Sequence, residues 1–175
     1  MKEQRIEDIF EEAFYFLLTD YEFSLTRSKK ENWGYELIAM NSCTGVEIIY
    51  EFREAFAQII LYKLVDGKIV KNMTNAIRNN EPITGVSLEW IIAYKNPKAR
   101  IKPTYEYGVE SPFHEKNGLK NYVLFVANGL KEYAGDVLNG DFSIFGILDV
   151  MIKDNYWAYY NKLDTKSNKF EKDSL

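Results

Sequence analysis

The chain has 175 residues, of which 46% are hydrophobic and 27% are charged, so it is long enough and apolar enough to bury a core as one domain. Its net charge of −4 disfavours binding to nucleic acid or anionic lipid, which require a basic surface, and favours a protein partner that is basic. A single cysteine cannot form an internal disulfide, and the longest apolar runs are far shorter than the roughly 20 residues that cross a bilayer.

These features predict a single cytoplasmic domain over residues 1–175, with no membrane segment and a polar tail that frays over 162–175. The N-terminal segment also lacks the apolar stretch and the cleavage site of a signal peptide.

The first predicted element is an amphipathic helix over residues 4–19, because apolar residues recur there at helical spacing. From Phe23 the hydrophobic period changes to two, which is typical of strands half-buried in a sheet. The predicted strands are residues 23–28, 33–41, 45–52 and 55–65. Their connections are too short for parallel crossovers, so we expect an antiparallel meander.

The second half of the chain predicts helices. Ser87 can cap a short helix that ends before Pro97, and residues 96–118 read as a long loop. Two helices, 119–138 and 142–160, then follow each other across Asn139-Gly140 and should pack as an antiparallel hairpin. The predicted fold class is therefore α+β, with an antiparallel sheet of about four strands packed against an N-terminal helix and a C-terminal helical hairpin.

The main polar feature is a row of charged and aromatic side chains expected on one face of the sheet. A turn centred on Cys43 pairs the second and third strands so that one face carries Trp33, Tyr35, Glu47, Glu51 and Arg53. The other face of the third strand, which carries Val46, Ile48, Tyr50 and Phe52, then points into the core. Exposed aromatic residues and arginine are typical anchors of protein interfaces, so the five residues form a candidate docking face. The alternative interpretation is a solvated row of charges with no function.

Catalytic and metal chemistry have little support in the sequence. Glu47 and Glu51 lie about 13 Å apart along one strand, which is too far for the paired carboxylates of a glycosidase. No nucleotide-binding or metal-binding motif is present, and one histidine with one cysteine cannot form a zinc site, so we predict neither cofactor nor metal. A Cys43–His114 catalytic pair would depend on the fold, and a turn cysteine with a surface histidine is the plainer interpretation.

Two segments, WGYELIAMNSCTGVEIIYEFREAF and LKEYAGDVLNGDFSIF, resemble small uncharacterised bacterial proteins, some of which are encoded beside polymorphic toxins as their immunity proteins. The resemblance implies binding rather than turnover, and it carries no catalytic residues. The leading hypothesis is therefore a protein-binding module, such as an immunity protein that occludes a toxin. The alternatives are a small enzyme or ligand-binding protein with a carboxylate and arginine site on the sheet face, and a subunit of a homo-oligomer.

Overall fold

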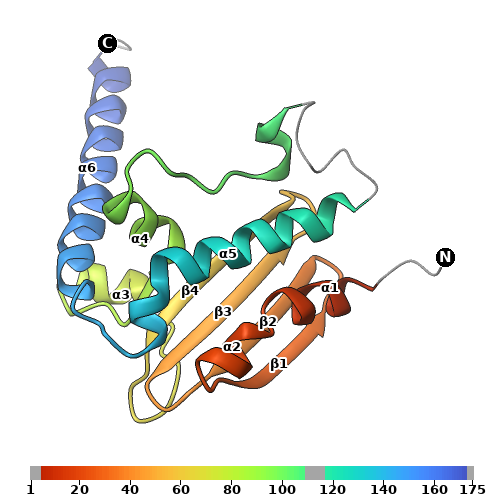
Figure 1. The fold of residues 1–175 in the computed structure, drawn as a ribbon. Helices are drawn as coiled ribbons and strands as arrows, with labels where there is room; N and C mark the ends of the chain where they lie inside the picture. Colours follow the sequence, from red (N-terminus) through yellow and green to blue (C-terminus); the bar gives the residue numbers. More distant parts are fainter. Residues whose placement is uncertain (1–4, 109–116, 173–175) are drawn as a thin grey trace.

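A five-stranded antiparallel sheet forms the centre of the computed structural model, which describes residues 5–108 and 117–172. The strands are β1 (Ser24–Lys30), β2 (Gly34–Met40), β3 (Thr44–Glu51), β4 (Phe56–Lys63) and β5 (Gly85–Ser87). Each strand pairs with the next one along the chain, so the α+β class and the antiparallel meander are confirmed (Figure 1). The short strand β5 adds a fifth member to the four that the sequence predicts.

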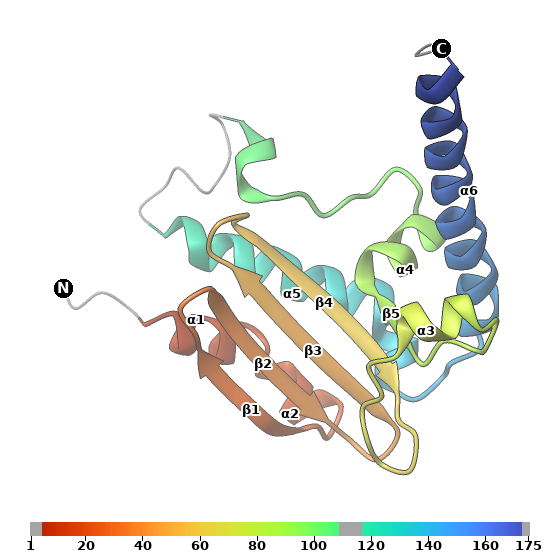
Figure 2. The ribbon, with the colours of Figure 1, turned by 180° about the vertical axis from the view of Figure 1, so that it is seen from behind.

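The helices cover mainly one face of the sheet. They are α1 (Ile6–Ala13), α2 (Phe16–Asp20), α3 (Met73–Arg78), α4 (Leu88–Lys95), the 3-10 helix η1 (Thr104–Tyr107), α5 (Gly118–Leu138) and α6 (Phe145–Lys172). α1, α2 and α5 lie across one face (Figure 1). Seen from behind, β1, β2 and β3 carry no helix in the described part of the chain, whereas α3 lies beside β5 (Figure 2). We call this second side the open face.

The hydrophobic core lies between the sheet and α1, α2 and α5. On the three central strands its buried side chains are Tyr35, Leu37, Ala39, Val46, Ile48, Tyr50, Ala57, Ile59 and Leu61. The ring of Phe10 on α1 lies 4.8 Å from that of Tyr35 and 5.6 Å from that of Tyr50. Burying one such large apolar side chain stabilises the fold by about 1.5–3 kcal/mol. Aromatic side chains also lie on the surface, where Trp33 and Phe52 are among the exposed ones.

The expected register of the β2–β3 hairpin is wrong by one residue. Ala39 pairs with Val46 and Ile38 with Glu47, where a turn centred on Cys43 would pair Ala39 with Glu47. The cause is Asn41, whose side-chain Oδ1 accepts hydrogen bonds from the backbone N–H of Cys43 at 3.0 Å and of Thr44 at 2.7 Å. This Asx turn closes a shorter loop. A slip of one residue moves every β2 side chain to the other face of the sheet.

Two helical predictions also differ in detail. The N-terminal helix is interrupted between Ala13 and Phe16, where the N–H of Leu17 bonds to the carbonyl of Phe14 at 3.0 Å in a tighter turn. The C-terminal helices follow each other as predicted but are not antiparallel neighbours: α5 lies across the sheet, while α6 rises beside α4 (Figures 1 and 2). The backbone of α6 stays helical to Lys172, through residues predicted to form a polar tail.

Candidate functional site

The open face of the sheet is a mixture of apolar and charged side chains. Ile38, Glu47 and Ile60 occupy one row across β2, β3 and β4, because Glu47 pairs with Ile38 on one side and with Ile60 on the other. The isoleucines are half-buried, and Glu47 is only 1% exposed. A carboxylate on an uncovered sheet face is thus shielded almost completely from water.

Two side chains cover the Glu47 carboxylate. The Tyr62 hydroxyl, from β4, donates a 2.8 Å hydrogen bond to Oε2, and the Lys71 ammonium forms an ion pair with Oε1. Lys71 comes from the connection between β4 and α3 and also lies 3.9 Å from Oε1 of Glu36, which is itself paired with Arg27. Burying a carboxylate is costly unless it is paired and hydrogen-bonded, and both conditions are met here.

Tyr62 is held in place by a close approach of the backbone. A Cβ atom on Gly85 would lie 2.6 Å from the Tyr62 ring, so glycine at this position of β5 leaves room for the ring. Burial raises the pKa of Tyr62 above its ordinary value, and the hydrogen bond to the Glu47 carboxylate raises it further. The phenol therefore stays protonated and acts as a hydrogen-bond donor at physiological pH.

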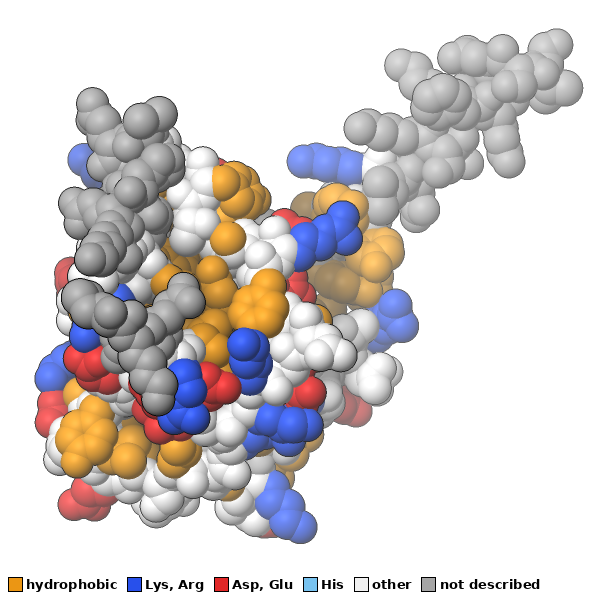
Figure 3. All heavy atoms as spheres, turned by 90° about the vertical axis from the view of Figure 1, so that its right-hand side faces the viewer, with side chains coloured by type: hydrophobic (Ala, Val, Ile, Leu, Met, Phe, Trp, Pro, Cys, Tyr) orange, Lys and Arg blue, Asp and Glu red, His pale blue; other side chains and the backbone are white. Residues whose placement is uncertain are grey.

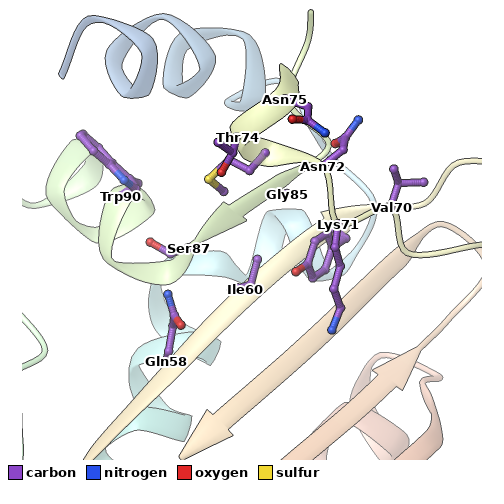
Figure 4. A pocket seen from close by; sticks show the side chains of 12 residues that line it. Gln58, Ile60, Val70, Lys71, Asn72, Thr74, Asn75, Gly85, Ser87 and Trp90 are labelled. Atoms are coloured by element: carbon purple, nitrogen blue, oxygen red, sulfur yellow. The ribbon is translucent and has the colours of Figure 1, made fainter. Parts of the chain in front are cut away.

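A pocket of about 410 Å³ opens beside this network, between β4, β5 and α3 (Figure 4). Lys71 lies on one side of the pocket and Trp90 on the other, with Gln58 on β4 and Asn75 on α3 between them. Its size falls within the range of small-molecule sites, which are usually apolar clefts with a few convergent polar groups. Among the described residues, no carboxylate lines the pocket, because Glu47 is covered by Tyr62 and Lys71.

A second feature lies at the end of the sheet where the β1–β2 and β3–β4 turns meet. The backbone N–H of Phe52 donates a 3.1 Å hydrogen bond to the carbonyl of Trp33, which joins the two turns. Trp33 is 48% exposed and Phe52 is 40% exposed, and Glu51 and Arg53 are exposed next to Phe52. The view onto this end of the molecule shows hydrophobic side chains between basic and acidic ones (Figure 3). We call Trp33, Glu51, Phe52 and Arg53 the sheet-end cluster.

The five residues of the predicted docking face are only partly brought together. Trp33, Glu51 and Arg53 belong to the sheet-end cluster, whereas Glu47 lies in the middle of the open face. Tyr35 is fully buried on the core face, with its hydroxyl 2.8 Å from that of Ser28. Burial raises the pKa of Tyr35 to about 12. Glu47 and Arg53 therefore do not form the carboxylate and arginine site of the alternative function.

Several residues of the open face are missed by the sequence interpretation. The correct register places Glu36 on the same face as Glu47, as its diagonal neighbour on β2, and the signal for that register is Asn41 as a turn-former. Phe52 was expected in the core and lies instead in the β3–β4 turn, which Ala55 closes with a φ of 47°. For Lys71, which lies outside any strand or helix, the sequence carries no periodic signal.

The chain matches none of the protein-family models, curated proteins or solved structures with which it was compared. Within residues 5–108 and 117–172, no helix is long and apolar enough to cross a membrane. The same residues contain no group of three or more histidine, cysteine, aspartate or glutamate side chains placed to hold a metal ion. Cys43 lies in the β2–β3 turn, and His114 lies outside the described residues.

Proposed function

We propose that the protein is a protein-binding module that docks its partner through the sheet-end cluster. The observation that carries the proposal is the position of Trp33 and Phe52 on two turns joined by a backbone hydrogen bond. The two turns that carry these large aromatic side chains are thereby held together at one end of the sheet. Aromatic residues and arginine at the centre of an interface supply most of its binding energy.

Arg53 adds an exposed charged group to the sheet-end cluster. Its side chain is 94% exposed, and the ion pair that it forms with Glu54 has a distance of 3.8 Å, at the limit of such a contact. The guanidinium is therefore available to a partner. Glu51 and Glu54 lie on either side, and together with the net charge of −4 they favour a partner with a basic surface.

The form of this function that the sequence resemblance implies is an immunity protein. Such a protein would act in the cytoplasm by covering the active site of a toxin with the sheet-end cluster. No catalytic residue is required in this role. Rigid docking is sufficient, because complexes of this kind commonly form with little movement of the backbone.

The test is a pull-down from lysate of the source cells, with the purified wild-type protein and three variants as baits. We expect Trp33→Ala to reduce partner binding by about 30-fold, which corresponds to an interface anchor of about 2 kcal/mol, and Arg53→Ala to reduce it less. Trp157→Ala is the matched control, because Trp157 is 45% exposed on α6, away from the sheet-end cluster. Equal recovery of the partner by wild type, Trp33→Ala and Arg53→Ala would show that this surface is not the interface.

A further inference from the structure

The outer edge of β1 carries backbone groups that no other strand of the described residues uses. β1 stands first in the order of the sheet and pairs with β2 alone, and Figures 1 and 2 show no described element beside its outer edge. The N–H of Glu31 bonds to the carbonyl of Gly34 at 2.9 Å, and bonded and non-bonded pairs alternate along the antiparallel ladder from there. The N–H and C=O groups of Ser28 and Lys30 therefore point away from β2.

The features that usually protect a sheet edge do not block the last part of β1. Edge strands are commonly protected by charged side chains, above all lysine, and by bulges. The bulge of β1 lies earlier in the strand, where the register shifts between Leu25 and Arg27. An ion pair with Glu36 draws Arg27 inward over β2, and a 2.6 Å ion pair with Glu31 holds Lys29 along its own strand. This stretch of the edge is therefore open to a further strand.

A small apolar pocket lies beside β1 on the core-facing side of the sheet. It has a volume of about 150 Å³ and lies between α1, α2 and the first two strands. Tyr15, Leu18 and Leu25 line it and are 60%, 38% and 39% exposed. Glu11 also lines it, and the carboxylate of Glu11 accepts a hydrogen bond from the Ser28 hydroxyl. A strand added to β1 would direct every second side chain to this side, so one aliphatic side chain can enter the pocket.

The charge along this edge favours an acidic occupant. β1 contains Arg27, Lys29 and Lys30 and no acidic residue. Arg27 and Lys29 are paired with Glu36 and Glu31, whereas the Lys30 side chain is exposed and forms no ion pair within the described residues. A second copy of β1 would bring the same cations face to face, which is unfavourable. A carboxylate opposite Lys30 would instead gain an ion pair.

We propose that the outer edge of β1 binds an extended acidic segment of a partner protein as an additional antiparallel strand. The backbone of the segment bonds to Ser28 and Lys30, an aliphatic side chain enters the pocket beside Leu18 and Leu25, and a carboxylate pairs with the Lys30 ammonium. Strand addition of this kind obtains affinity from the main chain and specificity from alternate side chains. The proposal does not rest on docking through the sheet-end cluster, which uses side chains of two turns rather than the edge of a strand.

The test is an NMR titration of the ¹⁵N-labelled protein with the peptide acetyl-TETVTLT-amide. Its glutamate and leucine are four residues apart, as are Tyr35 and Ala39, the β2 residues that pair with Lys30 and Leu25. We expect saturable shifts of the backbone amide signals of Ser28 and Lys30. Methylation of the backbone nitrogen of the valine, which faces β1, should weaken binding at least about tenfold, because a hydrogen bond is lost and the strands are forced apart. Methylation of the threonine that follows the valine, whose N–H faces away from β1, is the matched control and should leave binding unchanged.

Two protein variants test the side-chain contacts. Lys30→Glu should weaken binding of the peptide about fivefold, because the attraction for the glutamate becomes a repulsion. Leu18→Ser should weaken it by a similar factor, because the leucine of the peptide loses an apolar contact. Lys98→Glu, the same charge change at an exposed position outside the sheet, is the matched control. The proposal is overturned if the unmethylated peptide does not bind, if the two methylated peptides bind equally, or if Lys30→Glu and Leu18→Ser both bind like wild type.

Discussion

The Tyr62 hydroxyl donates a 2.8 Å hydrogen bond to the carboxylate of Glu47 in the middle of the open face, where a solvated charge would be the ordinary arrangement. The Lys71 ammonium, from the connection between β4 and α3, covers the other carboxylate oxygen by forming an ion pair with it. The result is a network of paired polar groups whose centre is buried, although no helix of the described residues covers it. Its members should be energetically coupled, because each of them replaces water around the same carboxylate.

Replacing Lys71 with methionine should destabilise the protein by about 2 kcal/mol, because the buried Glu47 carboxylate loses its counter-ion. In the double variant Glu47→Gln, Lys71→Met, the loss should be smaller than the sum of the two single losses. Urea denaturation of the four proteins measures this cycle. Lys98→Met is the control, since Lys98 is exposed, and its effect should stay within about 0.5 kcal/mol. Strict additivity of the single losses would contradict the coupling.

The Gly85→Ala variant should lose about 1–3 kcal/mol of stability, because the added Cβ would lie 2.6 Å from the Tyr62 ring. In a Tyr62→Ala background the same substitution should be much less harmful, since the ring is gone. Thermal melts of the variants measure both effects. Gly146→Ala is the matched control: this residue lies in α6 with open space around it, so alanine should stabilise the helix. An equal loss in both Gly85→Ala backgrounds would exclude the ring as the cause.

The buried carboxyl group of Glu89 should make the stability of the protein depend on pH. Its Oε1 atom is buried without a hydrogen-bond partner among the described residues, and burial raises its pKa above the ordinary value of 4.5. The folded protein therefore binds the proton more tightly than the unfolded chain does. The stability contributed by Glu89 is fully present below pH 4.5 and is lost as the pH rises through the raised pKa.

The Glu89→Gln variant removes this titration. The variant should become more stable than wild type as the pH rises, because a buried charge without an ion-pair partner is replaced by a neutral amide. The difference in free energy of unfolding should reach about 1 kcal/mol at pH 8. Urea denaturation from pH 4 to pH 8 measures the difference. A difference that does not change with pH, or that favours wild type at high pH, would be inconsistent with a raised pKa.

Truncating Tyr35 in β2 and truncating Trp33 in the turn before it should have very different effects on stability. Tyr35→Ala removes a fully buried ring that contacts Phe10 and should cost about 3–5 kcal/mol. Trp33→Ala removes a half-exposed ring and should change stability by no more than about 0.5 kcal/mol. Chemical denaturation compares them directly. If Trp33→Ala were the more damaging variant, the register described for β2 would be incorrect.

The sequence was sufficient for the order and type of most elements, because hydrophobic periodicity reports directly which side of an element is buried. It correctly placed Val46, Ile48 and Tyr50 in the core. The register between β2 and β3 was harder to predict, since both alternating sets of β2 side chains contain apolar residues. One set contains Tyr35, Leu37 and Ala39, and the other contains Glu36, Ile38 and Met40, so each set has two large apolar residues. Hydrophobicity alone therefore does not determine the register of this strand.

The candidate site was harder to predict because its parts are joined only in three dimensions. Lys71 and Glu47 are brought together by the path of a connection between β4 and α3, which has no periodic pattern. The pocket likewise depends on where the six residues of α3 lie relative to β4. The exposure of Trp33 and Arg53 could be expected from the sequence, because Trp33 begins one predicted strand and Arg53 directly follows another.

The β2–β3 turn is also fastened to the C-terminal end of α5, nearly a hundred residues further along the chain. The amide nitrogen of Asn41 donates to the carbonyl of Leu138 at 3.2 Å, and the adjacent Thr44 hydroxyl donates to that of Val137 at 3.0 Å. During synthesis, β2 and β3 emerge long before these partners exist. The Asx turn of Asn41 sets the register within the hairpin itself, and the two hydrogen bonds fasten this turn to the C-terminal end of α5 only after that helix has been made.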